Sequence, residues 1–174
     1  MNPYRIYRDE WVRALTVQTT AARYTTFVAM PFQETFSYRS REILCTVIGG
    51  AIDEANRRAE TPRTFAKPER IDLPTGATVI TEDIVLRILE SHIFIADVTF
   101  ENAGVLLETG VALGTKPNAQ IILITQGAHS DLHFDLRNNR VISYNTTGSV
   151  AEIATALVAA ARYFEDQVQQ QIGL

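Results

Sequence analysis

The sequence predicts an α/β fold, a flavodoxin-like three-layer α/β/α domain around a central, mainly parallel sheet of five strands. Three observations predict it. Strand-like and helix-like segments alternate along the 174 residues. The central strand candidates are continuous apolar runs, as expected of strands covered on both faces. The helix candidates repeat apolar residues at three- and four-residue spacing. This alternation is typical of a parallel sheet with helices on both sides.

The first half of the chain supplies two strands and one long helix. Residues 1–22 are polar and mildly amphipathic, and we expect an N-terminal helix or arm preceding the domain at 23–174. Residues 24–30 are β-branched and aromatic and stop at a proline, which predicts a strand. Apolar spacing predicts a helix over 39–58. Residues 63–72 form a weaker strand candidate, which we place at the sheet edge because a proline interrupts it.

In the second half of the chain, predicted helices and strands alternate more clearly. A helix is predicted over 80–89, with Thr78 or Thr81 as its cap, and a doubly buried strand over 93–96. Asn102 can cap a helix that ends at Gly114, before a proline. The remaining elements are a strand over 120–125, a polar loop over 126–133, a short strand over 141–144 and a C-terminal helix over 150–168.

Composition limits the classes of partner. The chain carries 20 acidic and 16 basic residues, a net charge of −4, so it lacks the basic excess that binds nucleic-acid polymers. No uncharged apolar run reaches 18 residues, so no membrane span is expected. No secretory signal is visible, which predicts a cytoplasmic protein. The single cysteine, Cys45, lies in an apolar stretch and is expected to be a buried hydrophobe.

Ligands of such folds bind outside the carboxyl ends of the strands, so the candidate functional residues are those that follow the predicted strands. The first end is Met30-Pro31-Phe32, where the Phe32 ring either stacks on a base or sugar or packs in a turn. A glycine-rich dinucleotide fingerprint and a P-loop are absent from the sequence, which disfavours the nucleotide-binding modes that need them. Asp72 follows the edge strand, where an acidic residue is most often solvated.

Two further carboxylates are more informative. Asp97 ends a buried strand, where it either contacts a ligand hydroxyl or caps the following loop. Glu108 is the only charge in a helix that is apolar nearly all round, so we expect that helix to be buried on most faces. Its carboxylate then needs a polar cleft, a partner or a raised pKa, unless Glu108 faces solvent. Two such carboxylates suggest glycosidic chemistry, in which one attacks or stabilises an anomeric carbon.

Several segments, taken in order, resemble the nucleoside 2-deoxyribosyltransferase-like superfamily, in its bacterial branch related to Toll/interleukin-receptor (TIR) domains. The resemblance covers about residues 24–146. It is carried by Phe-Val-Ala-Met-Pro-Phe at 27–32, Ile-Phe-Ile-Ala-Asp-Val-Thr at 93–99, Asn102, Leu-Glu-Thr-Gly-Val-Ala-Leu at 107–113, Phe134-Asp135-Leu136, Arg140 and Tyr144.

The resemblance implies cleavage or transfer at the N-glycosidic bond of a nucleoside, nucleotide or NAD-like molecule, without a cofactor. Glu108 matches the nucleophilic glutamate of the family, and Asp97 and Asp72 fall where acidic residues contact sugar or base. Enzymes of this kind often build shared sites, so the resemblance also suggests a homo-oligomer. The remaining candidates for substrate binding are Met30, Phe32, Thr99, Asn102, Phe134 and Asp135.

The sequence also departs from the family pattern. Asn102-Ala103-Gly104-Val105 replaces Asn-Pro-Asn-Val, threonine replaces the leucine after Glu108, and the histidine that often follows is missing. These departures motivate one alternative, a non-catalytic nucleotide-sensing or oligomerising TIR-like module. A further alternative, within the enzyme class, is a TIR-like NAD hydrolase. Either would act in bacterial signalling or antiviral defence.

A rival cluster lies in the polar loop. His129, Asp131, His133 and Asp135 alternate, and in an extended segment they would share one face and suit a metal ion. Ser130 among them also permits a nucleophile. The composition is that of a surface loop, so we expect neither a metal site nor a serine triad there, but a mobile polar flap over the Glu108 cleft.

Overall fold

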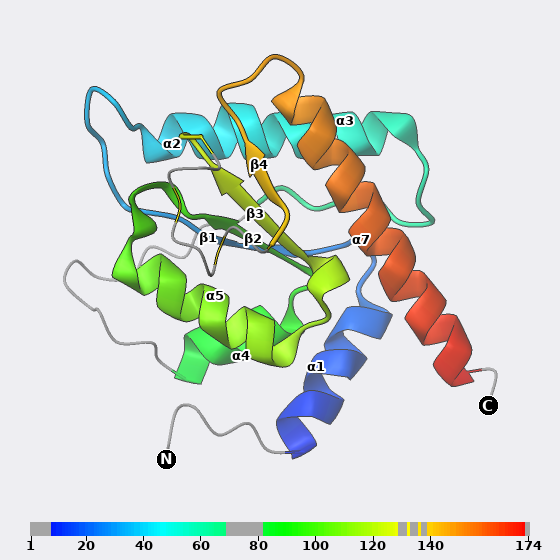
Figure 1. The fold of residues 1–174 in the computed structure, drawn as a ribbon. Helices are drawn as coiled ribbons and strands as arrows, with labels where there is room; N and C mark the ends of the chain where they lie inside the picture. The colour runs from blue at the N-terminus through cyan, green and yellow to red at the C-terminus, as the bar shows by residue number, and fades with distance from the viewer. Residues whose placement is uncertain (1–7, 69–81, 129–131, 133–135, 137–138, 173–174) are drawn as a thin grey trace.

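The computed structural model describes residues 8–68, 82–128, 132, 136 and 139–172. Within them the chain forms an α/β structure around a four-stranded parallel sheet in the order β1-β2-β3-β4 (Figure 1). Val28 pairs with Ile95, and Ile95 with Ile122, so the registers of the three longer strands are aligned across the sheet. The strands are β1 (Thr26–Ala29), β2 (Ile93–Asp97), β3 (Ile121–Thr125) and β4 (Val141–Ser143).

Within the described residues the sheet has four strands and not the five predicted. In the described part of the 63–72 candidate, Phe65 forms only an isolated parallel bridge with Tyr24. The Tyr24 N–H donates to the carbonyl of Thr64 at 2.9 Å, and the Ala66 N–H donates to the carbonyl of Tyr24 at 2.8 Å. Pro68 lacks an N–H group and cannot extend this ladder. Residues 69–72 lie outside the described part.

Strand residues alternate between two cores, one on each face of the sheet. Val28, Ile95 and Ile124 face a core shared with η1, α3 and α7, while Phe94 and Leu123 face one shared with α1, α4 and α5. Figure 1 shows these two helix groups on opposite sides of the sheet. The helices are α1 (Arg8–Thr20), α2 (Ser40–Glu42), η1 (Ile43–Ile48), α3 (Gly49–Arg58), α4 (Glu82–Glu90), α5 (Ala103–Thr115) and α7 (Ser149–Ile172).

The helix predicted over 39–58 forms, but its first half contains a π-helical segment, η1. Ile43 and Ile48 are the buried residues of η1, whereas Cys45 is exposed. The prediction of a buried cysteine was therefore wrong. An apolar neighbourhood in the sequence does not fix which face of a helix a residue takes, and here the larger isoleucines occupy the core side.

The prediction that α5 is buried on most faces was also wrong. Only Val105, Thr109 and Ala112 are buried, and they lie on one side of the helix. Leu107 and Leu113 on the other side keep 40% and 39% of their surface exposed. The helix is therefore surface-lying despite its composition, and Glu108 lies at the margin of its buried stripe.

The start of α5 follows the prediction. The Asn102 Oδ1 accepts hydrogen bonds from the backbone N–H groups of Gly104 at 3.0 Å and Val105 at 3.3 Å. These bonds satisfy two of the free donors at the helix start. Asn102→Ala is expected to lower the free energy of unfolding by about 1 kcal/mol, whereas Asn102→Asp should keep it within a few tenths. Urea denaturation measures both; equal stability of Asn102→Ala and wild type would contradict the cap.

The short 3₁₀ segments η2 (Thr99–Glu101) and η3 (Asn118–Gln120) connect β2 to α5 and α5 to β3. The helix α1 forms within the predicted N-terminal segment and buries Ala14 against the domain. No helix in the described parts of the chain combines the length and the apolar character needed to cross a bilayer.

Candidate active site at the carboxyl ends of the strands

A pocket of about 590 Å³ lies at the carboxyl ends of the strands, where the sequence predicts the site. Segments that follow all four strands contribute to it. Ser37 comes from the connection after β1, Phe100 from that after β2, Gln126 from that after β3 and Asn145 from that after β4. Its described lining is Ser37, Thr99, Phe100, Glu101, Thr125, Gln126, Gly127, Ala128, Leu132 and Asn145.

Asp97 lies beneath this pocket, fully buried at the end of β2. Its Oδ2 accepts hydrogen bonds from the hydroxyl groups of Tyr38 at 2.8 Å and Tyr144 at 3.0 Å. Its Oδ1 accepts from the backbone N–H of Thr99 at 3.0 Å and from the Thr99 hydroxyl. The Thr99 Oγ1 in turn accepts from the Gln126 N–H at 2.8 Å. We call Asp97, Tyr38, Tyr144 and Thr99 the Asp97 cluster.

Burial raises the pKa of Asp97, and the hydrogen bonds from Thr99, Tyr38 and Tyr144 oppose that rise. Burial and the nearby carboxylate also raise the pKa of Tyr144, which therefore stays protonated as a donor. Both oxygens of Asp97 are already occupied by protein donors. In this structure Asp97 positions the segments around the pocket, and its partner Thr99 is the member of the cluster that reaches the pocket wall.

The backbone of η2 is strained beside the pocket. Phe100 has φ 63° and Glu101 has φ 47°, both in the left-handed region that residues other than glycine rarely adopt. The turn leaves Phe100 58% exposed, and its ring makes an edge-to-face contact with Tyr38, with 5.4 Å between the ring centroids. Such conformations cost about 1–3 kcal/mol each and cluster at binding sites. Phe100 is thus an aromatic wall that sequence reasoning missed.

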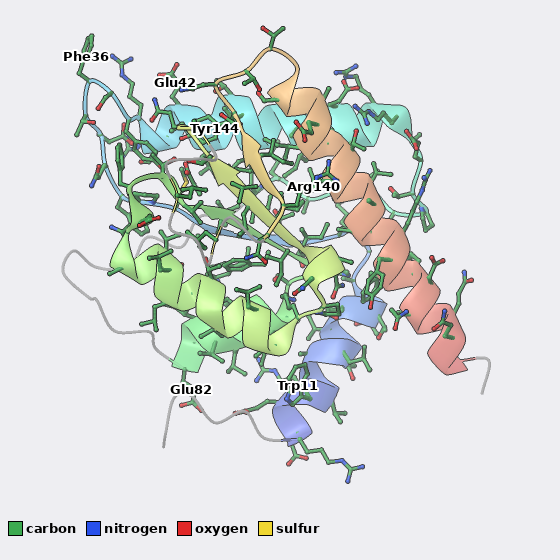
Figure 2. All side chains as sticks on the ribbon, viewed as in Figure 1. Trp11, Phe36, Glu42, Glu82, Arg140 and Tyr144 are labelled. Atoms are coloured by element: carbon green, nitrogen blue, oxygen red, sulfur yellow. The ribbon has the colours of Figure 1, made fainter. Side chains whose placement is uncertain are left out.

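Of the two candidate residues at the end of β1, Met30 lies in the core and Phe32 on the surface. Met30 is buried in the core shared with α3 and α7 and is not among the described residues that line the pocket. Phe32 is exposed, as is Phe36 farther along the same connection. Figure 2 shows Phe36 at the outer end of this connection, directed into solvent. Neither ring is among the described residues that line the pocket.

Glu108 lies half-buried on α5, six residues after the cap residue Asn102. Burial raises its pKa to about 7. Within the described residues it forms no hydrogen bond or ion pair, and it is not among the described residues that line the pocket. The structure therefore does not bring Glu108 and Asp97 into direct contact. Glu108 is thus a half-buried carboxylate with a raised pKa, on the helix that follows η2.

Tyr38 is the main residue of the site that the sequence did not reveal. Tyr144 entered only as part of the resemblance, and Figure 2 shows it beside the sheet. A signal was present in principle, because an aspartate at the end of a doubly buried strand needs donors, and tyrosines follow β1 and β4. Three predicted substrate-binding residues, Asp72, Phe134 and Asp135, lie outside the described residues, as do His129, Ser130, Asp131 and His133 of the polar loop.

The part of the chain that the structure describes holds no group of three or more histidine, cysteine or acidic side chains placed to bind a metal ion. Comparison of the chain with family models, with curated proteins and with solved structures gave no significant match. The geometry of the pocket and of Glu108, together with the fold that places them, is therefore the basis for a functional proposal.

Proposed function

We propose that this chain binds a nucleoside or nucleotide in the pocket at the carboxyl ends of the strands and cleaves or transfers at its N-glycosidic bond. Glu108 is the catalytic carboxylate in this proposal. The observation that carries it is the half-buried Glu108, with a pKa raised to about 7 and no partner among the described residues, on the helix that begins directly beside the pocket. Loss of solvation makes the ionised form of such a carboxylate costly, and a group of this kind beside a pocket is a candidate for a functional role.

The fold supports the proposal. We infer a flavodoxin-like three-layer arrangement, in which the Phe65 segment occupies the position of the second strand. Backbone groups of successive residues point to opposite edges of a strand, and the Thr25 carbonyl accepts from Ile93 on the β2 side. The Tyr24–Phe65 bridge therefore lies on the outer edge of β1. This gives the order 2-1-3-4-5, whose ligands bind at the carboxyl ends of the strands.

The position of Glu108 also agrees with the proposed reaction. Long side chains on a helix are directed back toward its N-terminus. That direction leads from Glu108 toward the η2 end of α5, where the pocket lies. Phe100 offers a ring for stacking on a base, while Thr99, Gln126 and Asn145 offer polar groups for a sugar.

The proposed reaction has two steps. The ionised Glu108 carboxylate attacks the anomeric carbon, the C–N bond breaks, and the electron pair of that bond leaves with the base, which takes up a proton from solvent. In hydrolysis a water oxygen then replaces the Glu108 oxygen at the anomeric carbon, and the water gives up one proton to solvent. In transfer a nitrogen of a second base replaces it and gives up its proton, and in both cases the Glu108 carboxylate is restored. Because the first step needs the carboxylate, activity is expected to rise as the pH increases through about 7.

The test is to incubate the purified protein with deoxynucleosides, their monophosphates and NAD, and to follow free base or nicotinamide by chromatography. Glu108→Gln is expected to reduce base release about 100-fold or more. Glu82→Gln, which removes an exposed carboxylate in the first turn of α4, serves as the matched control and should leave the rate unchanged. Base release that persists in Glu108→Gln would show that another group performs the reaction.

A second candidate function is nucleotide binding without catalysis. The observation that favours it is the engagement of both Asp97 oxygens by protein donors, so that Asp97 holds the protein segments around the pocket in place instead of contacting a substrate. Equilibrium binding of a nucleotide, measured by calorimetry, together with no release of base from any compound, would favour this candidate over the enzyme.

A further inference from the structure

A second pocket, of about 340 Å³, lies near the amino ends of β2 and β3, at the opposite end of the strands from the candidate active site. It is bounded by α1, the C-terminal half of α7, and the chain that leads from α5 into β3. Figure 2 shows Trp11 on α1 in this part of the molecule, far from Tyr144 at the other end. The function proposed above does not use this pocket.

Lys116 is the charged residue in the described wall of this pocket, and only 7% of its surface is exposed. Its Nζ donates hydrogen bonds to the carbonyls of Leu89 at 3.4 Å and Ser91 at 2.5 Å, at the C-terminal end of α4. An ammonium group has three donors, so these two bonds leave one N–H for another acceptor. The Gln18 amide donates to the same two carbonyls, at 2.6 and 2.8 Å.

The charge of Lys116 lacks a counter-ion within the described residues. The described ion pairs join arginines to glutamates, and none includes this lysine. His92, which is buried nearby, is neutral at pH 7, because burial above all, and also the charges of Arg63 and Lys116, lower its pKa to about 4. Burial likewise lowers the pKa of Lys116 to about 7. A bound anion would relieve this cost, since a paired buried charge is far less unfavourable than an unpaired one.

The other walls of the pocket are largely apolar. Trp11 and Leu15 come from α1 and remain 44% and 41% exposed although they border the pocket. Tyr163, Phe164 and Val168 come from α7. Large apolar side chains that flank one buried cation are the arrangement expected of a site for an amphipathic anion, in which a few polar groups fix orientation and apolar walls hold the body.

We propose that this pocket binds a small organic carboxylate with an aromatic or aliphatic body, its carboxylate on Lys116 and its body against Trp11, Leu15 and Phe164. The volume lies at the lower end of the range of small-molecule pockets, which suits a compact acid. A phosphate is disfavoured because its charge and three acceptor oxygens require several donors. A carboxylate needs fewer, and the free N–H of Lys116, with the amide of Gln120 in the same wall, supplies them.

The chain offers an internal control, because Lys67 and Lys116 are its only lysines. Phenylacetate and hexanoate, with phenylacetamide and hexanamide as neutral counterparts, are titrated against wild type, Lys116→Met and Lys67→Met by calorimetry. Lys67 is exposed, so Lys67→Met should bind the acids like wild type. Lys116→Met keeps the apolar stem and loses the charge; it should bind the acids at least about 10-fold more weakly, with amide binding unchanged.

Trp11→Ala tests the apolar wall and provides an independent readout if Lys116→Met fails to fold. It should weaken the acids and the amides alike, because it removes body contacts and leaves the charge. Three results would each overturn the proposal. The first is equal binding of the acids by wild type and a folded Lys116→Met, and the second is binding of the acids that Trp11→Ala does not weaken. The third is no binding of either acid to wild type at millimolar concentration.

Discussion

Asp97→Ala is expected to lower the free energy of unfolding by about 3–4 kcal/mol, a large fraction of the stability of an ordinary domain. The substitution leaves the buried hydroxyl groups of Tyr38 and Tyr144 and the donors of Thr99 without their acceptor. Each buried donor left unsatisfied costs about 1–3 kcal/mol, and loss of the costly buried carboxylate offsets part of the sum.

Urea denaturation at pH 7 measures this effect. Asp53→Ala, which removes an exposed aspartate on α3, is the matched control and should stay within about 0.5 kcal/mol of wild type. If Asp97→Ala does not fold, Tyr38→Phe removes the hydrogen bond to Asp97, and Tyr144→Phe removes its bond to Asp97 and a longer one to the Thr99 hydroxyl; each variant should lower the free energy of unfolding by about 1 kcal/mol. An Asp97→Ala variant as stable as the control would show that the cluster does not hold these segments together.

The Asp97 cluster explains why the pocket lies where it does. The Asp97 carboxylate, at the end of β2, accepts hydrogen bonds from Tyr38 in the segment after β1 and from Tyr144 directly after β4. One carboxylate therefore connects three strand ends. Thr99 extends the connection to the chain after β3 through Gln126. The strand ends are thus fixed relative to one another, so the polar groups around the pocket keep their positions without a ligand. Preorganisation of this kind favours binding and catalysis.

The sequence predicted the elements that have strong periodicity. The doubly buried strands β2 and β3, the helix start at Asn102 and the long C-terminal helix are confirmed, because apolar runs and a capping asparagine are local signals. The edge strand at 63–72 was not predictable in the same way. Its composition permits pairing, but whether an edge residue pairs depends on the neighbouring strand. Among residues 63–68, which the structure describes, Phe65 alone forms a bridge.

The sequence predicted that the candidate site lies at the carboxyl ends of the strands, but it did not predict the side-chain contacts made there. The sequence indicates that Asp97 can contact a ligand, but it does not predict the hydrogen bond from Tyr38, because this tyrosine lies in a loop with no periodic signal. For α5, the mostly apolar composition led to a wrong prediction of burial on most faces. Leu107 and Leu113 face outward beside glycines, so a helix with one charge still presents a surface face.

Glu108→Gln is expected to make the chain more stable at neutral pH and to leave its stability unchanged near pH 4.5. Burial raises the pKa of Glu108 from 4.5 to about 7, so the folded state binds the proton more tightly than the unfolded state. The resulting stabilisation is fully present below pH 4.5 and is lost as the pH rises through 7. Glutamine mimics the protonated acid at every pH.

The free energy of unfolding of Glu108→Gln should therefore exceed that of wild type by a margin that grows between pH 5 and 8 and then levels off. The pKa displacement sets an upper limit of about 3 kcal/mol, and partial exposure of the side chain reduces the expected plateau to about 2 kcal/mol. Urea denaturation at pH 5, 7 and 8.5 measures the margin, and contributions from Asp97, His92 and Lys116 cancel because both proteins carry them. Glu82→Gln should show a margin that does not change over this range. A margin equally flat for Glu108→Gln would mean that its carboxylate is solvated or paired, and the chemistry proposed for it would lose its physical basis.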